Sequence, residues 1–292
     1  MTDNETKARQ LLAEAEKKIS SSSKGFFSQF TGGNKTEEAI DCFHRAGNLF
    51  KQAKKWNEGG NAFMQAGTLQ LKNNNKHDAG LCFVDAANCY KKSNPGDAIK
   101  AIERAVEIHT DMGRFIMVAK HHESIAEIYE KELENQEKAI DHYQHAADCY
   151  AGEENKSSAN KCLIKIANYS ALIDRLDKAI ALYEQLGKAA AENSLMKYNS
   201  KEYFFKAGLC HLCIDLLNCQ QALNRYIDLS PAFQDTREYK FLLKLIENLE
   251  EEDSDAFSET VKEFDSISRL DQWYTTMLLK IKRQIQTGED LR

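Results

Sequence analysis

The chain has 292 residues, of which 39 are basic and 45 acidic, giving a formal net charge of −6, and 42% are hydrophobic. This composition is typical of a globular protein of one or two domains, and an isoelectric point near 5.8 argues against a general nucleic-acid binder. No uninterrupted apolar run approaches the roughly 20 residues that a membrane-spanning helix needs. Only 14 glycines and two prolines, Pro95 and Pro231, interrupt the chain. We therefore predict an all-α fold.

The N-terminal segment gives no sign of export. Residues 1–15 include acidic side chains and no apolar stretch as long as a secretory signal. We therefore expect a cytoplasmic protein. Its eight cysteines could form four disulfides in an exported chain, but here we expect them to stay reduced and to pack as small hydrophobes between helices.

Small residues recur every 19 to 21 positions over the first two thirds of the chain. They stand at Ala39, Gly59 and Gly60, Ala79, Ala98, Ala119, Ala139, Ala159 and Ala179. This spacing predicts one helix and one short turn per block, and alternate blocks match each other, so the unit is a helical hairpin. The hairpin resembles a tetratricopeptide (TPR) repeat but is longer than its roughly 34 residues. One hairpin cannot bury its own apolar face, so we expect the hairpins to stack.

The repeat loses its register after Ala179, because the next comparable small residue is Ala222. Residues 191–200 are expected to form an irregular connection, and Pro231 and the acid-rich residues 247–255 continue the irregularity. We therefore predict two domains. Residues 1–200 form a twisted sheet (solenoid) of TPR-like antiparallel helical hairpins, and residues 201–292 form a C-terminal helical bundle. The last helix is expected over residues 273–285, with a stop at Thr287–Gly288.

The sequence carries no signature of catalysis. It has no glycine-rich phosphate loop, no nucleophile elbow and no zinc-protease motif. Cys210 and Cys213 form a CxxC pair without a second ligand pair at zinc spacing. The pairs His121–His122 and His142/His145 are interpreted as ordinary helix surface. We predict neither an enzyme, nor a metal site, nor a bound cofactor.

Three phenylalanines stand in a serine- and glycine-rich stretch over residues 20–35. Phe26, Phe27 and Phe30 lie between Lys24 and Lys35, and the surrounding composition predicts a loop that does not continue a helix. The rings can fold back as a lid on the first hairpin. Alternatively, they can insert among lipid headgroups and give weak, reversible attachment to a membrane surface.

Certain cations follow the hairpin period. Lys120, Lys161 and Lys201 are spaced by 41 and 40 residues, Lys165 follows Lys161 by one helical turn, and Arg114 opens the helix that carries Lys120. These side chains can be a solvated face, because helix surfaces are rich in lysine. They can equally form a basic track for a long acidic partner such as a helical bundle.

Longer strings of the sequence resemble a known family. They are Leu11–Glu16, the Phe26–Phe27 pair, Gly60–Phe63, Lys76–Ala79, Cys82–Asp85, Thr110–Phe115, Ala119–His122, Ser158–Cys162, Lys201–Lys206 and Ser266–Trp273. The resemblance runs from end to end of the chain. It is to the soluble NSF attachment proteins (SNAPs) of the alpha/beta type.

This resemblance implies an adaptor for vesicle-mediated protein transport. Several copies would coat a SNARE bundle of syntaxin-type, SNAP-25-type and synaptobrevin-type helices after membrane fusion and recruit the hexameric ATPase NSF to disassemble it. The implied SNARE-binding residues are Lys54, Lys91, Arg114, Lys120, Lys161, Lys165, Lys201 and Arg237. Phe26 and Phe27 would attach to membranes, and Leu291 would stimulate the ATPase. The alternative is a generic TPR-like scaffold that captures peptide termini in a cytosolic chaperone complex.

Overall fold

The computed structural model describes residues 3–22 and 28–289, and the side chains of residues 3–21 and 35–285. Within these ranges the chain is helical and contains no strand, which confirms the predicted all-α class. The α-helices are α1 (Asp3–Ser22), α2 (Ser28–Gln52), α3 (Trp56–Lys72), α4 (Lys76–Tyr90), α5 (Pro95–Asp111), α6 (Phe115–Lys131), α7 (Gln136–Gly152), α8 (Lys156–Leu172), α9 (Leu176–Glu192), α10 (Ser200–Ile214), α11 (Leu216–Leu229), α12 (Arg237–Glu250), α13 (Ser254–Ile267) and α14 (Gln272–Glu289). Two short 3₁₀ helices, η1 (Lys197–Asn199) and η2 (Pro231–Asp235), stand where irregular connections were expected.

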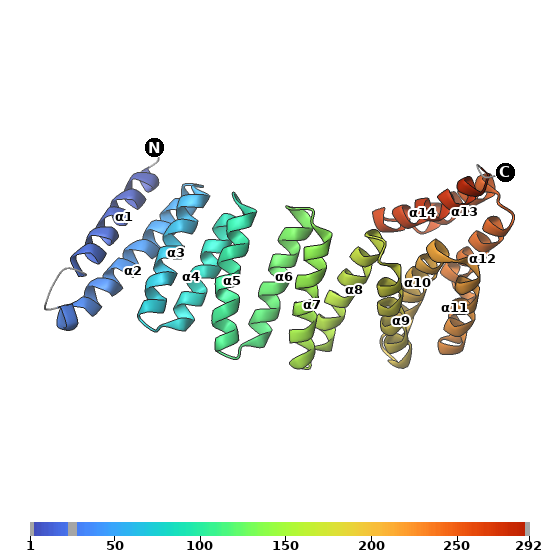
Figure 1. Ribbon diagram of the computed structural model, residues 1–292, viewed down its shortest axis with the longest axis horizontal. Coiled ribbons are helices and arrows are strands. Elements are labelled where there is room, and N and C mark those ends of the chain that lie inside the picture. Colours follow the sequence, from blue (N-terminus) through green and yellow to red (C-terminus); the bar gives the residue numbers. More distant parts are fainter. Residues whose placement is uncertain (1–2, 23–27, 290–292) are drawn as a thin grey trace. The chain divides into compact units, whose positions relative to one another are not determined.

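The chain separates into two compact units, Met1–Ala159 and Asn160–Arg292. In the first unit, α1 to α7 lie side by side and alternate in direction, each against the next (Figure 1). From α3 to α9 the helices begin 19 to 21 residues apart, which confirms the predicted period. The functional division expected at residue 200, between a SNARE-binding layer and an ATPase-contacting bundle, stays a prediction.

The turns between these helices are tight and need little glycine. Most contain one residue with positive φ, namely Lys54, Asn74, Gly113, Glu134, Glu154 and Asp174, and only one of these is a glycine. Asparagine often follows: the side chains of Asn75, Asn135 and Asn155 accept hydrogen bonds from backbone N–H groups in the first turn of the next helix. Most of these turns therefore contain one left-handed residue, and several of the helices begin at an asparagine cap.

The small residues of the repeat mark the contacts between helices. The seven alanines of the predicted series are buried, with at most 6% of their surface exposed, and Gly59 and Gly60 are buried with them. A Cβ atom added at Gly60 would lie 2.5 Å from the ring of Tyr90. Close approach of the helices, rather than backbone freedom, therefore requires a small residue here.

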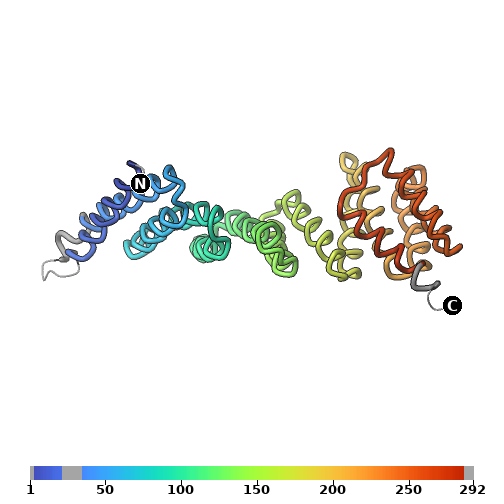
Figure 2. The backbone as a smooth tube through the Cα atoms, turned by 90° about the horizontal axis from the view of Figure 1, so that it is seen from above, coloured from blue at the N-terminus to red at the C-terminus, as the bar shows by residue number. Residues whose placement is uncertain are grey.

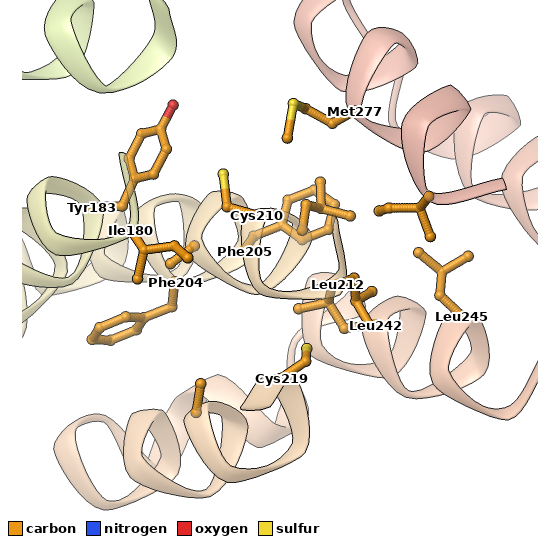
Figure 3. Packing of buried hydrophobic residues seen from close by; sticks show 14 of the residues in the cluster. Ile180, Tyr183, Phe204, Phe205, Cys210, Leu212, Cys219, Leu242, Leu245 and Met277 are labelled. Carbon is orange, nitrogen blue, oxygen red and sulfur yellow. The ribbon is translucent and has the colours of Figure 1, made fainter. Parts of the chain in front are cut away.

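The core of the second unit joins α8, α9 and α10 to the helices that follow them. Figure 3 shows Tyr183, Phe204 and Phe205 gathered around α10, with Met277 of α14 close by. Phe204 stacks on Tyr226 with ring centroids 4.6 Å apart. Aromatic rings and large aliphatic side chains make up most of this core, whereas the repeat has a buried alanine or glycine in each block.

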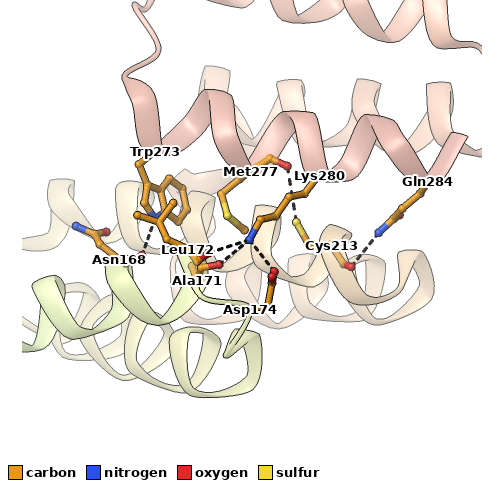
Figure 4. Close-up of polar contacts among 9 residues, drawn as sticks. All are labelled: Asn168, Ala171, Leu172, Asp174, Cys213, Trp273, Met277, Lys280 and Gln284. Atoms are coloured by element: carbon orange, nitrogen blue, oxygen red, sulfur yellow. Dashed lines mark hydrogen bonds and ion pairs between the residues drawn. The ribbon is translucent and has the colours of Figure 1, made fainter. Parts of the chain in front are cut away.

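Helix α14 is fastened to the second unit by a series of hydrogen bonds (Figure 4). The indole Nε1 of Trp273 donates to the carbonyl oxygen of Asn168 at 3.1 Å. Lys280 Nζ donates to the carbonyl oxygens of Ala171 and Leu172 at 3.2 Å and pairs with Asp174 at 2.6 Å. In the tube view of Figure 2, α14 is the red helix of this unit.

Two local expectations are wrong. The serine- and glycine-rich stretch was expected to exclude helix, but α1 continues to Ser22 and α2 begins at Ser28. Each glycine in a helix costs only about 1 kcal/mol, which a long packed helix can offset. The stop expected at Thr287–Gly288 is also absent, because α14 continues to Glu289.

Candidate functional site

In the first unit, the predicted cations lie on turns and on one helix face. Lys54 lies in the turn between α2 and α3, and Arg114 precedes the first residue of α6. Lys120 lies on α6, and all three side chains are exposed. The turns that hold Lys54 and Arg114 are at opposite edges of the layer, because an odd number of helices separates them. The cations therefore cross the layer instead of following one edge.

Lys91 differs from the other cations of the first unit, because it is only partly exposed. It follows the last residue of α4, and its Nζ donates a 2.5 Å hydrogen bond to Ser124 Oγ on α6. Burial lowers the pKa of its ammonium group, and the nearby Glu127 opposes this. Its neighbour Lys92 is exposed. A partner that used Lys91 would have to replace the bond to Ser124.

In the second unit, Lys161 is an exposed residue of α8. It is the sixth residue of its helix, as Lys120 is of α6, so the repeat places both at the same helical position. Lys165 lies one turn later, with its Nζ 5.8 Å from the ring centroid of Tyr169. Lys201 is the second residue of α10 and pairs with Glu238 at 2.8 Å. Lys201 does not share the helical position of Lys120 and Lys161, because residues 193–199 between α9 and α10 interrupt the repeat.

Arg237 begins α12, and its side chain is exposed. Phe26, Phe27 and Leu291 lie outside the described residues. Phe30 lies in α2, and its side chain is outside the described part. The membrane-attachment and ATPase-stimulating roles of these residues therefore stay predictions.

Sequence reasoning missed a group of exposed apolar residues shortly before Lys201 in the sequence. Leu195 and Tyr198 are 88% and 75% exposed, and Met196 between them is 42% exposed. Large apolar side chains with this exposure are typical of surfaces that bind a partner. The signal was present in the sequence, because these residues stand in the predicted irregular connection, where no helical period can bury them.

His121, His122 and His142 are not ordinary helix surface, so that interpretation is wrong for these three residues, whereas His145 is exposed. His121 is buried, and its Nε2 lies 3.1 Å from His109 Nδ1. His122 Nδ1 lies 3.0 Å from His142 Nδ1, and the ring centroids of His122 and His145 are 5.0 Å apart. Burial and the neighbouring imidazoles lower the pKa of His122 from 6.5 to about 4. His121, His122 and His142, whose pKa values are lowered by burial, pack between α5, α6 and α7.

Other chemistry is limited in the part of the chain that the structure describes. Across residues 3–22 and 28–289, no group of three or more His, Cys, Asp or Glu side chains is arranged to hold a metal ion. None of the helices described there is long and apolar enough to cross a membrane. Six of the eight cysteines are buried, Cys210 among them, and burial raises the pKa of Cys213 to about 12. Thiolate chemistry is therefore disfavoured at the CxxC pair.

A family model described as soluble NSF attachment protein, SNAP, matches residues 6–286. The chain belongs to this family. It is 56% identical to the alpha-soluble NSF attachment protein of Homo sapiens over 99% of this chain and 98% of the relative. It is 53% identical to the beta-soluble NSF attachment protein of Bos taurus over 97% and 95%. The identity to the vesicular-fusion protein SEC17 of Komagataella phaffii is 38%, over 98% of each chain.

The fold also resembles that of a solved repeat protein. A signal-transduction ATPase with a tetratricopeptide repeat sensor from Pyrococcus horikoshii matches 96% of this chain and 46% of its own, with a TM-score of 0.51 and 15% identity. This likeness concerns the fold alone, and it confirms the TPR-like class. Membership in the SNAP family assigns the chain to the attachment proteins and not to a class of enzymes.

Proposed function

We propose that the protein is an adaptor that binds assembled SNARE complexes, recruits the NSF ATPase and stimulates it to disassemble them. Membership in the SNAP family over residues 6–286 is the observation that carries this proposal. In it, syntaxin-type, SNAP-25-type and synaptobrevin-type helices form the bundle, and several copies of the chain surround it. The protein is cytoplasmic and attaches to membranes peripherally through Phe26, Phe27 and Phe30.

The exposed cations support the part of the proposal that concerns the SNARE bundle. Lys120 and Lys161 are exposed at equivalent helical positions in a chain whose net charge is −6. A basic track in an acidic protein attracts a long acidic partner and repels a basic one. Leu195 and Tyr198, a few residues before Lys201 in the sequence, add exposed apolar area.

The acidic turn between α12 and α13 supports the part that concerns the ATPase. Glu247, Glu250 and Glu251 are exposed at the end of α12, and Asp253 caps α13 by accepting from the backbone N–H groups of Asp255 and Ala256. In this proposal, these acids dock on a basic surface of NSF, and Leu291 adds a small apolar contact that favours the hydrolysing state.

A charge-reversal pair tests the SNARE contact. Lys120→Glu with Lys161→Glu replaces two attractions by two repulsions, so we expect SNARE binding to weaken by at least about tenfold, or about 1.4 kcal/mol. Affinity for a reconstituted SNARE bundle is measured at several salt concentrations, together with disassembly by NSF and ATP. Binding by the natural chain should weaken steeply with salt, because exposed charges are screened over about 8 Å at physiological ionic strength.

Lys138→Glu with Lys178→Glu is the matched control. These lysines are exposed third residues of α7 and α9 and share the 40-residue spacing, but they are outside the predicted set. Equal binding by both double variants would show that the track is a solvated face. Capture of a chaperone by the natural chain, without SNAREs or NSF, would favour the scaffold alternative.

A further inference from the structure

A groove of about 280 Å³ lies between α12 and α13 in the second unit. Its floor is aromatic, because Phe241 and Phe264 stack with ring centroids 4.2 Å apart. Ile267 lies on the rim and is 65% exposed, among the highest values for large apolar side chains in the described residues. An aliphatic side chain this exposed beside aromatic rings offers apolar surface that a partner can cover.

The side of the groove that α12 forms is cationic. Arg237, Lys240 and Lys244 line the groove from α12, and the one acid in the lining, Glu263, pairs with Lys244 at 3.2 Å. Arg237 and Lys240 are exposed and have no ion-pair partner among the described residues. The groove therefore carries a net positive charge within an acidic chain.

The spacing of these cations specifies the shape of the occupant. Positions 237, 240 and 244 differ by three and four residues, so they form one row along α12 with about 5–6 Å between neighbours. Carboxylates spaced by three and four residues on a helix form a row with the same pitch. An acidic helix lying along α12 can therefore place its acids against the cations, and an aliphatic side chain of the same helix against Ile267 and Phe264.

We propose that this groove, here called the α12–α13 groove, seats an apolar side chain of an acidic helix of the SNARE bundle. Arg237 belongs both to the predicted SNARE-binding set and to the groove, and the next residue, Glu238, pairs with Lys201 of that set. The inference rests on the proposed function and extends it in two ways. It adds Lys240 and Ile267 to the contact, and it makes part of the recognition apolar.

The apolar part is tested by Ile267→Asp, which puts a carboxylate where an apolar side chain and acids of the partner would meet. Leu279→Asp is the matched control, because Leu279 is an aliphatic residue of α14 with 57% exposure that lines a different pocket. We expect Ile267→Asp to weaken binding of a soluble SNARE bundle about tenfold and Leu279→Asp to leave it unchanged. Ile267→Ala, which adds no charge, should give a smaller loss that persists at high salt, because an apolar contact is not screened.

The cationic part is tested by Lys240→Glu against Lys262→Glu. Both lysines are exposed, but Lys262 lies outside the groove and pairs with Glu259. Only Lys240→Glu should weaken binding, with an effect that fades as salt rises. Melting temperatures of all variants check that each chain is folded.

These experiments distinguish failure of the groove proposal from failure of the proposed function. If the natural chain binds the bundle and Lys120→Glu with Lys161→Glu weakens binding, but Ile267→Asp and Ile267→Ala match the control, the groove proposal is wrong and the proposed function stands. If the natural chain does not bind the bundle, both are wrong. If Ile267→Asp weakens binding of NSF but not of the bundle, the groove belongs to the ATPase contact, and the proposal is likewise overturned.

Discussion

At the scale of single residues, the structure changes how the charged and titratable side chains are understood. A lysine of the predicted set, Lys91, already donates to Ser124 Oγ, whereas Lys120 has no ion-pair partner among the described residues. The sequence does not reveal this difference, because Ser124 is 33 residues away from Lys91. Only the helix packed alongside decides whether a lysine side chain is available to a partner.

The partly and fully buried histidines His122 and His121 predict that the first unit loses stability in acid. Unfolded, a histidine takes up a proton near pH 6.5, but His122 in the folded chain does so only near pH 4. The unfolded state therefore gains protons that the folded state does not, and stability is lost as pH falls from about 6.5 towards 4. His121, with a pKa also lowered to about 4, contributes in the same sense.

His122→Asn removes this titration but keeps a hydrogen-bonding atom near the position of Nδ1. We expect its melting temperature to fall less steeply between pH 7.5 and pH 5 than that of the natural chain. His77→Asn, at an exposed position of α4, is the control for substitution alone. Parallel melting curves for His122→Asn and the natural chain would contradict the prediction.

Glu184 makes the stability of the second unit depend on pH as well, at a lower pH than the histidines of the first unit. Its Oε1 accepts from His211 Nε2 at 3.2 Å and from the Tyr226 hydroxyl at 2.6 Å, so three helices share one carboxylate. The hydrogen bond from His211 and that from Tyr226 lower the pKa of Glu184 to about 2, although partial burial opposes them. The stability from this carboxylate is present above its usual pKa of 4.5 and is lost as pH falls towards 2.

At the scale of elements, the repeat and α14 are held by different forces. In the repeat, alanine and glycine let neighbouring helices approach, and each helix packs mainly on the next one along the chain. Helix α14 buries apolar side chains such as Met277 and in addition donates side-chain hydrogen bonds to backbone carbonyls. Lys280 reaches the last carbonyls of α8, the negative end of that helix, over more than 100 residues of sequence.

We therefore predict that Lys280→Met lowers the free energy of unfolding by about 1–2 kcal/mol, since three charged hydrogen bonds are lost and the apolar stem is kept. Lys282→Met should cost less, because Lys282 Nζ donates to one partner in the structure, Ser258 Oγ. Urea unfolding followed by circular dichroism measures both variants. Equal losses would show that the contacts at the end of α8 have no special weight.

At the scale of the whole molecule, the proposed adaptor joins a SNARE bundle, a membrane surface and an ATPase. The end of the chain tests the ATPase contact. Leu291→Ala removes one apolar side chain, so SNARE binding and NSF recruitment should stay near normal while stimulated ATP hydrolysis and disassembly are lost. Hydrolysis and disassembly are measured with the same reconstituted components. Disassembly at the normal rate would refute the role of Leu291 but not that of the family.

The phenylalanine segment tests the membrane contact. Phe26→Ser with Phe27→Ser withdraws apolar area worth about 25 cal/mol per Å² from lipid, so liposome attachment should weaken. Disassembly of membrane-anchored SNAREs should slow, and that of soluble SNAREs should not change. A melting temperature lowered by several degrees would instead indicate that the rings act as a lid on the first hairpin.

The sequence by itself determined the helical class, the 20-residue period, the buried small residues and the family. These features are local or periodic, so composition, spacing and matching strings reveal them. It also placed Lys120 and Lys161 at equivalent positions, because one repeat generates both. It failed at residues 20–22, 28–33 and 287–289, where a local glycine penalty was taken to end a helix that the fold extends.

Only the tertiary structure decided which cations are available, how α14 is fastened and where the α12–α13 groove lies. The bond between Lys91 and Ser124 joins residues 33 apart, and that between Lys280 and the Ala171 carbonyl joins residues 109 apart. The stacked rings of Phe241 and Phe264 likewise come from different helices. No periodicity links such positions in the sequence, because the packing of whole helices brings them together.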